Sequence, residues 1–476
     1  MQKFIHRTAL AAVAWIAIAA VLPAAAGQAA PPNVLLIFAD DLGYGDLGCY
    51  GSETIRTPHI DRLAREGRKF TNFMVASSVC TPSRAALLTG CYPKRVGMQR
   101  HVLMPTSQAG LHPDERTIAD HLRSLGYATA CFGKWHLGHL PEVLPRAQGF
   151  DEYFGIPYSN DMNYPDNRGP RPDGPAGLDA LWADPASTLT AWKTPLYEND
   201  ELCELPADQR TITRRYTQRA IDFISAHRAG PFFVYLAHSM PHVPLYVPDE
   251  VRDPDPRQAY VNVIEHLDAE VGRLLDTLDE LGLAETTYVI FTSDNGPWLS
   301  FRHHAGSAGP LRDGKMSTFE GGQRVPCLIR GPGIPAGSVC DGLTGTIDIL
   351  PTLAALTESS LPDDRPIDGV DMSRLWRGEA DTSPREEFLF YSAGGEIEGI
   401  RQGRWKLLVK QPPPDRDAPP DAARPEPRLL LFDLETDVGE QTNLASGSPA
   451  LVTRLRERMA ELDGELTAHA RPRWSR

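Results

Sequence analysis

The sequence predicts an α/β fold built on a mostly parallel central sheet that is sandwiched by helices. Two observations lead to this prediction. Helix-like and strand-like segments alternate along most of the chain, and the strand-like segments are apolar throughout instead of alternating apolar with polar residues. Strands buried on both faces have this composition, and parallel strands are joined by helical crossovers.

The first elements are marked by local signals. A strand is expected at VLLIFA (34–39) and a helix at 57–67, where Thr57 and Pro58 suit its start and Gly67 its end. The alternation then continues. The expected helix and strand pairs are TIADHLRSLG with YATACFG, TRRYTQRAIDFISAH with PFFVYLA, and a helix ending at LLDTLDELG with TYVIFTS.

A further helix is expected in the stretch SSVCTPSRAALLTG, residues 77–90. Thr81 can cap this helix, Pro82 fits its first position, and Gly90 can end it. This places Cys80 just outside the helix N-terminus, with Arg84 four residues further on.

Three regions are expected along the chain. Residues 1–30 combine a basic start, a short apolar run and small residues, which indicates a signal peptide. Residues 31–375 form the main domain, and residues 376–476 form a smaller C-terminal α+β subdomain that contains an antiparallel sheet. Within the latter, residues 411–427 are rich in proline and aspartate and are expected to form a loop between two strands.

The composition limits the kinds of partner that the chain is expected to bind. The net charge of −14 disfavours nucleic acid and anionic membranes, so an anionic substrate would need a locally positive pocket. No segment after the signal peptide is apolar enough to span a membrane. The seven cysteines are an odd number, and their pairing and the oligomeric state cannot be read from the sequence.

Polar residues follow four of the predicted strands. These residues are Asp40 and Asp41, Lys134 and His136, His238 and His242, and Asp294 and Asn295. Open α/β sheets bind ligands outside the carboxyl ends of their strands, so these side chains are expected to converge at one edge of the sheet.

Three carboxylates at one edge would repel one another by roughly 4 kcal/mol per pair at ~4 Å and therefore favour a bound cation. Oxygen ligands of this kind suit Ca²⁺ or Mg²⁺ better than zinc. With a divalent ion, the side chains of Arg84, Lys134 and Lys315 would make the local charge about +2, enough to attract an anion.

Cys80 has three interpretations: a buried structural cysteine, half of a disulfide, or a thiolate nucleophile whose pKa is lowered by the helix N-terminus and Arg84. A free thiolate is vulnerable to oxidation in an exported protein, and soft sulfur is mismatched with a hard cation. An oxygen nucleophile would fit this position better.

CTPSR is the C-x-P-x-R pattern of the sulfatases, which the chain resembles from about residue 33 to 445 within the alkaline phosphatase-like superfamily. The ordered segments that carry the resemblance are NVLLIFADDLGYGDLGCYG, CTPSRAALLTG, GKWHLG, FGIPYSND, PHVP, TSDNGP, DGKMSTFEGG and LFDLETDVGEQTNL. The region around FGIPYSND is most similar to the arylsulfatase A type.

The resemblance implies a role for each matching residue. Cys80 would be oxidised to formylglycine by a formylglycine-generating enzyme, and one Ca²⁺ would be held by Asp40, Asp41, Asp294, Asn295 and the modified Cys80. The aldehyde hydrate would attack sulfur, with Asp294 as proton acceptor. Arg84 and Lys134 would stabilise the nucleophile, Lys315 would bind sulfate, His242 would assist the leaving group, and His136 would act as the base that releases sulfate.

Several nearby residues are open to two interpretations. His238 could replace His242 or be a hydrogen-bonding neighbour, and Ser159 could contact the nucleophile or only shape its loop. Arg302, His303 and His304 lie where substrate selectivity would be set, but a surface loop is an equally good interpretation.

The sequence therefore predicts an exported sulfatase, periplasmic or secreted, that hydrolyses aryl sulfates or sulfated sugars and glycans. Two alternatives remain: a phosphonate monoester or phosphodiester hydrolase of the same superfamily, and a non-catalytic protein that binds sulfated glycans. No motif identifies the natural substrate.

Overall fold

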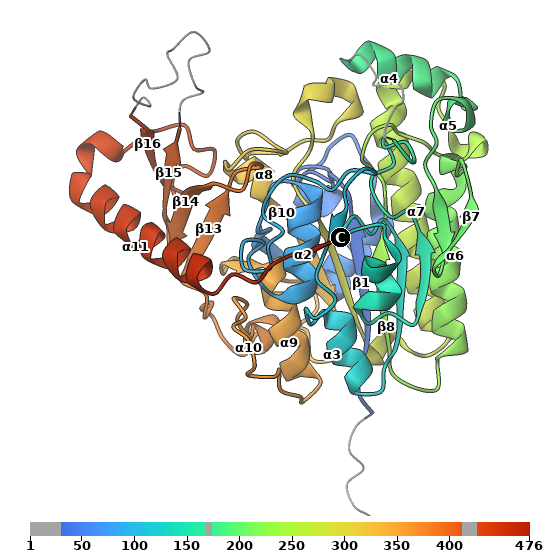
Figure 1. Cartoon of the computed structure of the whole chain (residues 1–476), viewed down its shortest axis with the longest axis horizontal. Coiled ribbons are helices and arrows are strands. Elements are labelled where there is room, and N and C mark those ends of the chain that lie inside the picture. Colours follow the sequence, from blue (N-terminus) through green and yellow to red (C-terminus); the bar gives the residue numbers. More distant parts are fainter. Residues whose placement is uncertain (1–29, 167–173, 412–425) are drawn as a thin grey trace, which may run out of the picture. The chain divides into compact units, whose positions relative to one another are not determined.

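The computed structural model describes residues 30–166, 174–411 and 426–476, and a large mixed sheet lies at its centre (Figure 1). The predicted signal peptide and most of the proline-rich loop lie outside the described residues. In spatial order the strands are β11 (Ser338–Cys340), β2 (Arg68–Met74), β10 (Arg324–Arg330), β9 (Thr287–Ser293), β1 (Asn33–Ala39), β8 (Phe232–Ala237), β4 (Ala128–Gly133), β5 (Glu152–Gly155), β6 (Leu196–Glu198) and β7 (Glu201–Glu204), with β12 (Thr344–Gly345) beside β2.

The five central strands, from β9 to β5, are all parallel, which confirms the predicted mostly parallel sheet. The margins differ from this pattern. β10 and β2 are antiparallel to their inner neighbours, and so are β6 and β7. Antiparallel neighbours need only a short connection, and residues 199–200 suffice between β6 and β7.

Alternate residues of each central strand face two different cores. In β1, Val34, Leu36 and Phe38 belong to one core, whereas Leu35 and Ile37 belong to the other. The first core is covered by α2 (Cys80–Thr89), α3 (Ile118–Ser124), α9 (Ile349–Leu356) and α10 (Ser373–Trp376). The second is covered by α1 (Pro58–Glu66), α4 (Gly174–Ala183), α6 (Gln209–Ala226) and α7 (Ala259–Glu280). Burial on both faces explains why these strands are apolar throughout.

The C-terminal region contains the predicted antiparallel sheet and closing helix (Figure 1). Its strands are β13 (Glu387–Tyr391), β14 (Ile397–Gln402), β15 (Trp405–Lys410) and β16 (Arg428–Asp433), and α11 (Pro449–Ala468) packs against them. The remaining elements are the pair β3 (Ala109–Gly110) and β17 (Trp474–Ser475), and the short helices α5 (Ser187–Thr190) and α8 (Glu320–Gln323). The boundary between residues 375 and 376 stays a prediction.

Most predicted helix limits agree with the structure. α1 begins at Pro58 after Thr57 and ends before Gly67, and α3 begins with a capping box between Thr117 and Asp120. Within the described residues, no helix combines the length and apolar character that crossing a membrane requires. All seven cysteines lie in the described part, and each is free.

Candidate active site

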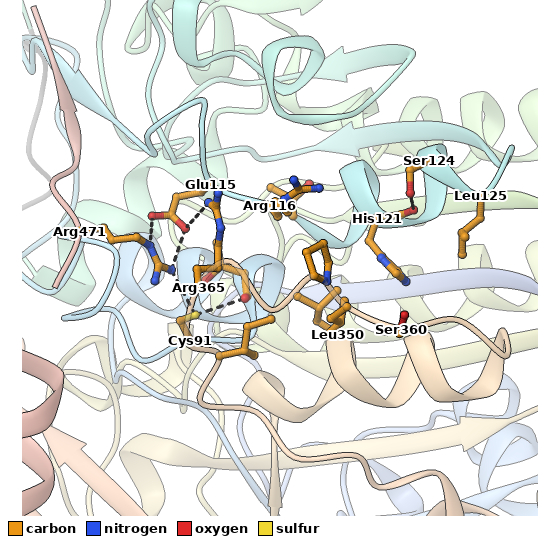
Figure 2. Close-up of a pocket in the computed structure, with 15 residues that line it drawn as sticks. Cys91, Glu115, Arg116, His121, Ser124, Leu125, Leu350, Ser360, Arg365 and Arg471 are labelled. Atoms are coloured by element: carbon orange, nitrogen blue, oxygen red, sulfur yellow. Dashed lines mark hydrogen bonds and ion pairs between the residues drawn. The ribbon is translucent and has the colours of Figure 1, made fainter. Parts of the chain in front are cut away.

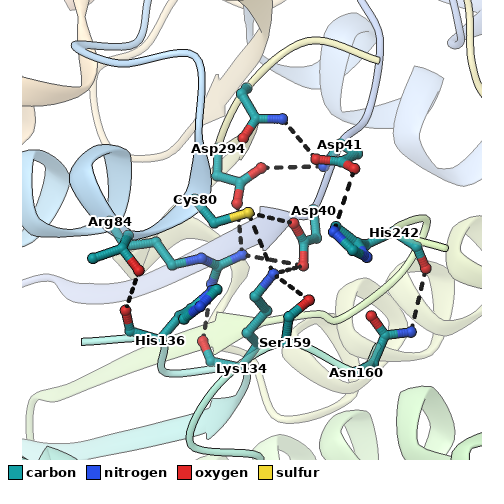
Figure 3. A network of polar contacts seen from close by, with 12 residues as sticks. Asp40, Asp41, Cys80, Arg84, Lys134, His136, Ser159, Asn160, His242 and Asp294 are labelled. Carbon is teal, nitrogen blue, oxygen red and sulfur yellow. Dashed lines mark hydrogen bonds and ion pairs between the residues drawn. The ribbon is translucent and has the colours of Figure 1, made fainter. Parts of the chain in front are cut away.

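The polar residues that follow the central strands meet at one edge of the sheet (Figure 3). β1 and β9 are paired in register as far as Ala39 and Ser293, so Asp40 and Asp294 leave the sheet side by side. The amide of Asp41 donates a hydrogen bond to Asp294 Oδ1 at 3.1 Å. The sequence separates these two residues by more than 250 positions, and the parallel pairing of their strands brings them together.

The position of Cys80 differs from the prediction in one detail. α2 begins at Cys80 itself and Val79 is its N-cap, so Thr81 is not the cap and Cys80 lies in the first turn. Thr81 instead donates a hydrogen bond from Oγ1 to the carbonyl of His136 at 2.8 Å and accepts one from the amide of Leu103. Its hydroxyl therefore ties the first turn of α2 to the loop after β4. The predicted end at Gly90 is confirmed, with φ of 66°.

Two lysines approach the sulfur of Cys80. Lys134 Nζ lies 3.4 Å and Lys315 Nζ 3.6 Å from Sγ, and Asp40 Oδ1 lies 3.6 Å away on another side. Figure 3 shows the sulfur between Lys134 and Asp40. The lysines also pair with carboxylates, Lys134 with Asp40 at 2.5 Å and Lys315 with Asp41 at 2.7 Å.

Arg84 joins the same network from the next turn of α2. Its Nη2 donates to Asp294 Oδ2 at 2.9 Å and its Nη1 donates to the carbonyl of Lys134 at 2.9 Å. The side chain is completely buried. Three cations and three carboxylates thus balance one another, and a divalent ion would bring the local charge to the expected +2.

Burial and these charges shift the pKa values in opposite directions. Burial raises the pKa of Asp41 to about 7, with repulsion from Asp40 and Asp294 adding to it and Lys315 opposing it. Burial also raises the pKa of Asp294. At Asp40, burial is outweighed by Lys134, Arg84 and Lys315, and the pKa lies below its ordinary value. A further positive charge would favour ionisation of all three carboxylates.

The donor set fits a hard divalent cation. Carboxylate oxygens of Asp40 and Asp41 lie within 4.8 Å of each other and of Cys80 Sγ and a His242 ring nitrogen, and the two carboxylates are the hard donors of this group. Asn295 donates from Nδ2 to Asp41 Oδ1 at 2.6 Å, while its own buried Oδ1 has no partner among the described residues. Carboxylate and amide oxygens are the ligands that Ca²⁺ and Mg²⁺ prefer, and Asn295 has its amide oxygen free for such a role within the described part of the chain.

The thiolate interpretation of Cys80 is not favoured by its surroundings. Burial raises the pKa of the thiol far above its ordinary value, and the nearby lysines only partly offset this effect. The unmodified side chain is therefore a protonated thiol and a weak nucleophile.

The three candidate histidines differ in whether they line the cavity at the site. His242 lines the cavity at the site, and its Nε2 lies 3.7 Å from Asp41 Oδ2. His136 lines the same cavity, and its Nε2–H donates a hydrogen bond to the carbonyl of Leu103 at 2.9 Å. His238 does not line the cavity, and neither of its buried nitrogens has a partner among the described residues. Geometry thus favours His242 over His238.

The cavity above Cys80 has a volume of about 160 Å³ and opens to solvent. Its polar lining includes Ser159, which lies 3.2 Å from Lys134 Nζ, and its apolar lining includes Val102, Met162, Trp298 and Met316. A charged base and largely apolar walls suit an anionic group carried on an apolar or weakly polar body.

Sequence reasoning missed two residues that shape this cavity. Lys315 Nζ lies 4.5 Å from the ring centre of Trp298, and the rings of Trp298 and His242 have their centres 5.5 Å apart. Asn160 donates to the carbonyls of His242 and Pro244 and so fixes the loop that carries His242. Trp298 follows the TSDNGP segment directly and Asn160 lies within FGIPYSND, so proximity to these motifs was the available signal.

Two other groups lie away from this cavity. Arg302, His303 and His304 do not line it, and the two histidines contact Asp179. A second, smaller cavity of about 90 Å³ is shown in Figure 2. Its charged groups are paired, for example Arg471 with Glu115 at 2.7 Å, so it offers no comparable site.

Comparison with known proteins agrees with the geometry. The Sulfatase family profile matches residues 32–359. Human arylsulfatase A (Homo sapiens) is 40% identical over 470 residues, covering 94% of this chain and 91% of the relative. Rat arylsulfatase G (Rattus norvegicus) is 38% identical over 449 residues, covering 89% and 84%.

Among solved structures, a sulfatase from Pseudoalteromonas sp. superposes with a TM-score of 0.77 at 26% identity, covering 92% of this chain and 91% of that one. The matches to human arylsulfatase A and to the Pseudoalteromonas structure cover 94% and 92% of this chain, so they extend beyond the residues that the family profile matches. This chain therefore belongs to the sulfatase family of the alkaline phosphatase-like superfamily and is a sulfuric ester hydrolase of the arylsulfatase type.

Proposed function

We propose that this chain is an exported, calcium-dependent arylsulfatase that hydrolyses sulfate monoesters with a formylglycine made from Cys80. One observation carries the proposal: Cys80 Sγ lies in the first turn of α2 within 3.6 Å of Lys134 Nζ, Lys315 Nζ and Asp40 Oδ1. A nucleophile at this point would meet an anionic substrate between two ammonium groups.

Asp40, Asp41, Asp294 and Asn295 are proposed as the calcium ligands, together with the side chain at position 80. Their hard oxygen donors and the unpaired Asn295 Oδ1 support this assignment. A bound divalent cation supplies positive charge that polarises a sulfate oxygen and favours the ionised form of the nucleophile.

The modification of Cys80 by a formylglycine-generating enzyme would resolve the mismatch at this position. The hydrated aldehyde supplies an oxygen nucleophile, whereas the buried thiol is protonated. Asp294, which lies beside Arg84 and Asp41, is proposed to accept the proton that the nucleophile loses.

The cations are proposed to act on the negative charge of the reacting sulfate. Lys315 lines the cavity and would bind a sulfate oxygen directly, while Lys134 and buried Arg84 would stabilise the nucleophilic oxygen. Positions fixed by Asp40, Asp41 and Asp294 reduce the reorganisation that these charges need during the reaction.

Two histidines are proposed to handle protons on opposite steps. His242 would protonate the leaving alcohol, and His136 would take a proton at position 80 when sulfate is released. Burial lowers the pKa of both imidazoles well below the ordinary value, so each is neutral in the resting site. A neutral His136 can accept a proton directly, whereas His242 must first gain the proton that it gives to the leaving alcohol, and the negative charge of a bound sulfate ester would favour this uptake.

The test is the chemical state of residue 80 in protein purified from its native host. Trypsin cleavage after Lys69 and Arg84 releases the peptide FTNFMVASSVCTPSR, whose mass distinguishes an aldehyde from a thiol. An aldehyde supports the proposal, and an unmodified or disulfide-linked cysteine in active protein would overturn it. Paired aryl sulfate and aryl phosphate diester substrates then separate sulfatase from phosphodiesterase activity.

A further inference from the structure

A second cluster of metal-ligating side chains lies outside the active site. Asp179 Oδ1 contacts His303 Nε2 at 2.6 Å and His304 Nε2 at 2.8 Å. Ligand atoms of the three residues lie within 4.8 Å of one another. None of the three lines the cavity above Cys80.

The two histidines are neighbours in sequence but point at the same carboxylate oxygen. They end the 3-10 helix η7 (Leu299–His304), and the residue before them, Arg302, has φ of 55° and ψ of −115°. Positive φ is uncommon for a residue with a side chain. This turn places the two imidazole rings 4.5 Å apart, at an angle of 42°.

The buried side chain of His304 makes few other polar contacts. His304 has a side-chain exposure of only 1%, and its Nδ1 has no hydrogen-bond partner among the described residues. Its one polar contact is therefore through Nε2, toward Asp179.

The carboxylate reaches the histidines from a different element. Asp179 lies within α4, which packs on η7, and its side chain is 37% exposed. His303 is 31% exposed, so an ion in solution can reach both residues.

We propose that Asp179, His303 and His304 form a binding site for a divalent transition metal, with Zn²⁺ as the preferred ion. Two imidazole nitrogens and one carboxylate oxygen are a common three-ligand set for Zn²⁺ and leave a fourth position for water. Nitrogen donors disfavour Ca²⁺ and Mg²⁺, so this site and the proposed calcium site differ in the ions that they select.

A bound ion would link α4 to the segment that follows Asn295. Within that segment Trp298, which lines the active-site cavity, packs on Phe301 at 4.7 Å, and His303 follows two residues later. The site would therefore brace one wall of the cavity from outside without contacting the substrate.

The experiment uses the whole enzyme without a polyhistidine tag, stripped of metal and then saturated with Ca²⁺. Zn²⁺ binding is measured by titration calorimetry, and Co²⁺ serves as an absorption probe because thiolate ligands add a charge-transfer band that imidazole and carboxylate do not. The test variants are Asp179→Asn and His303→Gln. Both replace partly exposed side chains on different elements, so each remains informative if the other variant does not fold.

The matched controls are Asp114→Asn, which alters an exposed His112–Asp114 pair 3.7 Å apart, and Cys203→Ser, which removes an exposed thiol. We expect one Zn²⁺ per chain, with affinity reduced about 100-fold or more in both test variants, because even partners of metal ligands are worth about 10- to 100-fold. Both controls should bind as the wild type does. Absence of Zn²⁺ binding in the wild type, a thiolate band with Co²⁺, or unchanged affinity in the folded test variants would overturn the proposal.

Discussion

Lys315 offers the sharpest test of the proposed chemistry, through the substitution Lys315→Met. Its Nζ lies 2.7 Å from Asp41 Oδ1 and 3.6 Å from Cys80 Sγ, and the side chain is 5% exposed. Methionine keeps much of the length and apolar contact with Trp298 while removing the charge. The local balance of three cations and three carboxylates then becomes negative by one.

The size of the effect follows from this geometry. A unit charge at 3.6 Å interacts with Lys315 by about 4 to 5 kcal/mol at an effective dielectric constant of about 20. Sulfate spreads its charge over several oxygens, so we take about 3 kcal/mol as the loss in the transition state. At about 1.4 kcal/mol per factor of ten, kcat/KM should fall about 100-fold.

The assay is the hydrolysis of a chromogenic aryl sulfate, with the peptide mass used to verify that residue 80 is converted equally in each variant. Lys315→Arg keeps the charge and should retain more activity than Lys315→Met. Lys410→Met removes a lysine that pairs with Glu398 at 2.5 Å in the C-terminal sheet, and it should leave kcat/KM unchanged. If folded, converted Lys315→Met keeps more than about a tenth of the wild-type kcat/KM, the proposed role of Lys315 is wrong.

Three further predictions address the metal, the leaving group and the C-terminal sheet. Removal of divalent cations with a chelator should abolish hydrolysis, and Ca²⁺ should restore it better than Mg²⁺; full recovery with Mg²⁺ alone contradicts the assignment. His242→Ala should lower kcat by about 10²- to 10⁴-fold for alkyl or sugar sulfates but less for aryl sulfates with acidic leaving groups, and equal losses would refute a role in protonation. Lys406→Met leaves Glu320 and Glu440 buried without the ammonium group that lies 2.8 and 3.0 Å away, and should cost about 3–5 kcal/mol in denaturant unfolding at pH 7. At Glu320, burial is outweighed by Lys406, Arg401 and Arg324, which lower the pKa from 4.5 to about 2. The contribution of this group to stability is therefore present above about pH 4.5 and lost toward pH 2. A difference in unfolding free energy between wild type and variant that stays constant from pH 7 to pH 3 would contradict this reasoning.

The central strands were predictable because a strand buried on both faces is apolar along its whole length, and a short apolar run is visible in the local sequence. β1, β4, β8 and β9 are short apolar runs between helices, and each run is buried on both faces, as in β1. Local sequence did not predict the antiparallel β10 and β2. Strand direction depends on the path of the connection and on the neighbour that a strand finds, and neither is encoded within the strand itself.

Some features of the candidate site could likewise be predicted from local sequence, and others could not. Asp40, Asp294 and Lys134 could be predicted because residues at the carboxyl ends of parallel strands share one edge of the sheet. The start of α2 was predicted wrongly, with Thr81 as the cap and Pro82 as the first helical residue, because the Thr81 hydroxyl finds a partner in the carbonyl of His136, 55 residues away. A local capping pattern contains no information about such a distant acceptor.

The amino-acid sequence by itself determined which segments are buried strands and helices, and which residue types stand at their ends, because both depend on neighbours within a few positions. The tertiary structure decided which of two histidines lines the cavity, which lysines approach Cys80, and that Asp179 meets His303 and His304. These contacts join residues that are tens to hundreds of positions apart, so they exist only once the order of the strands and the packing of the helices have been set.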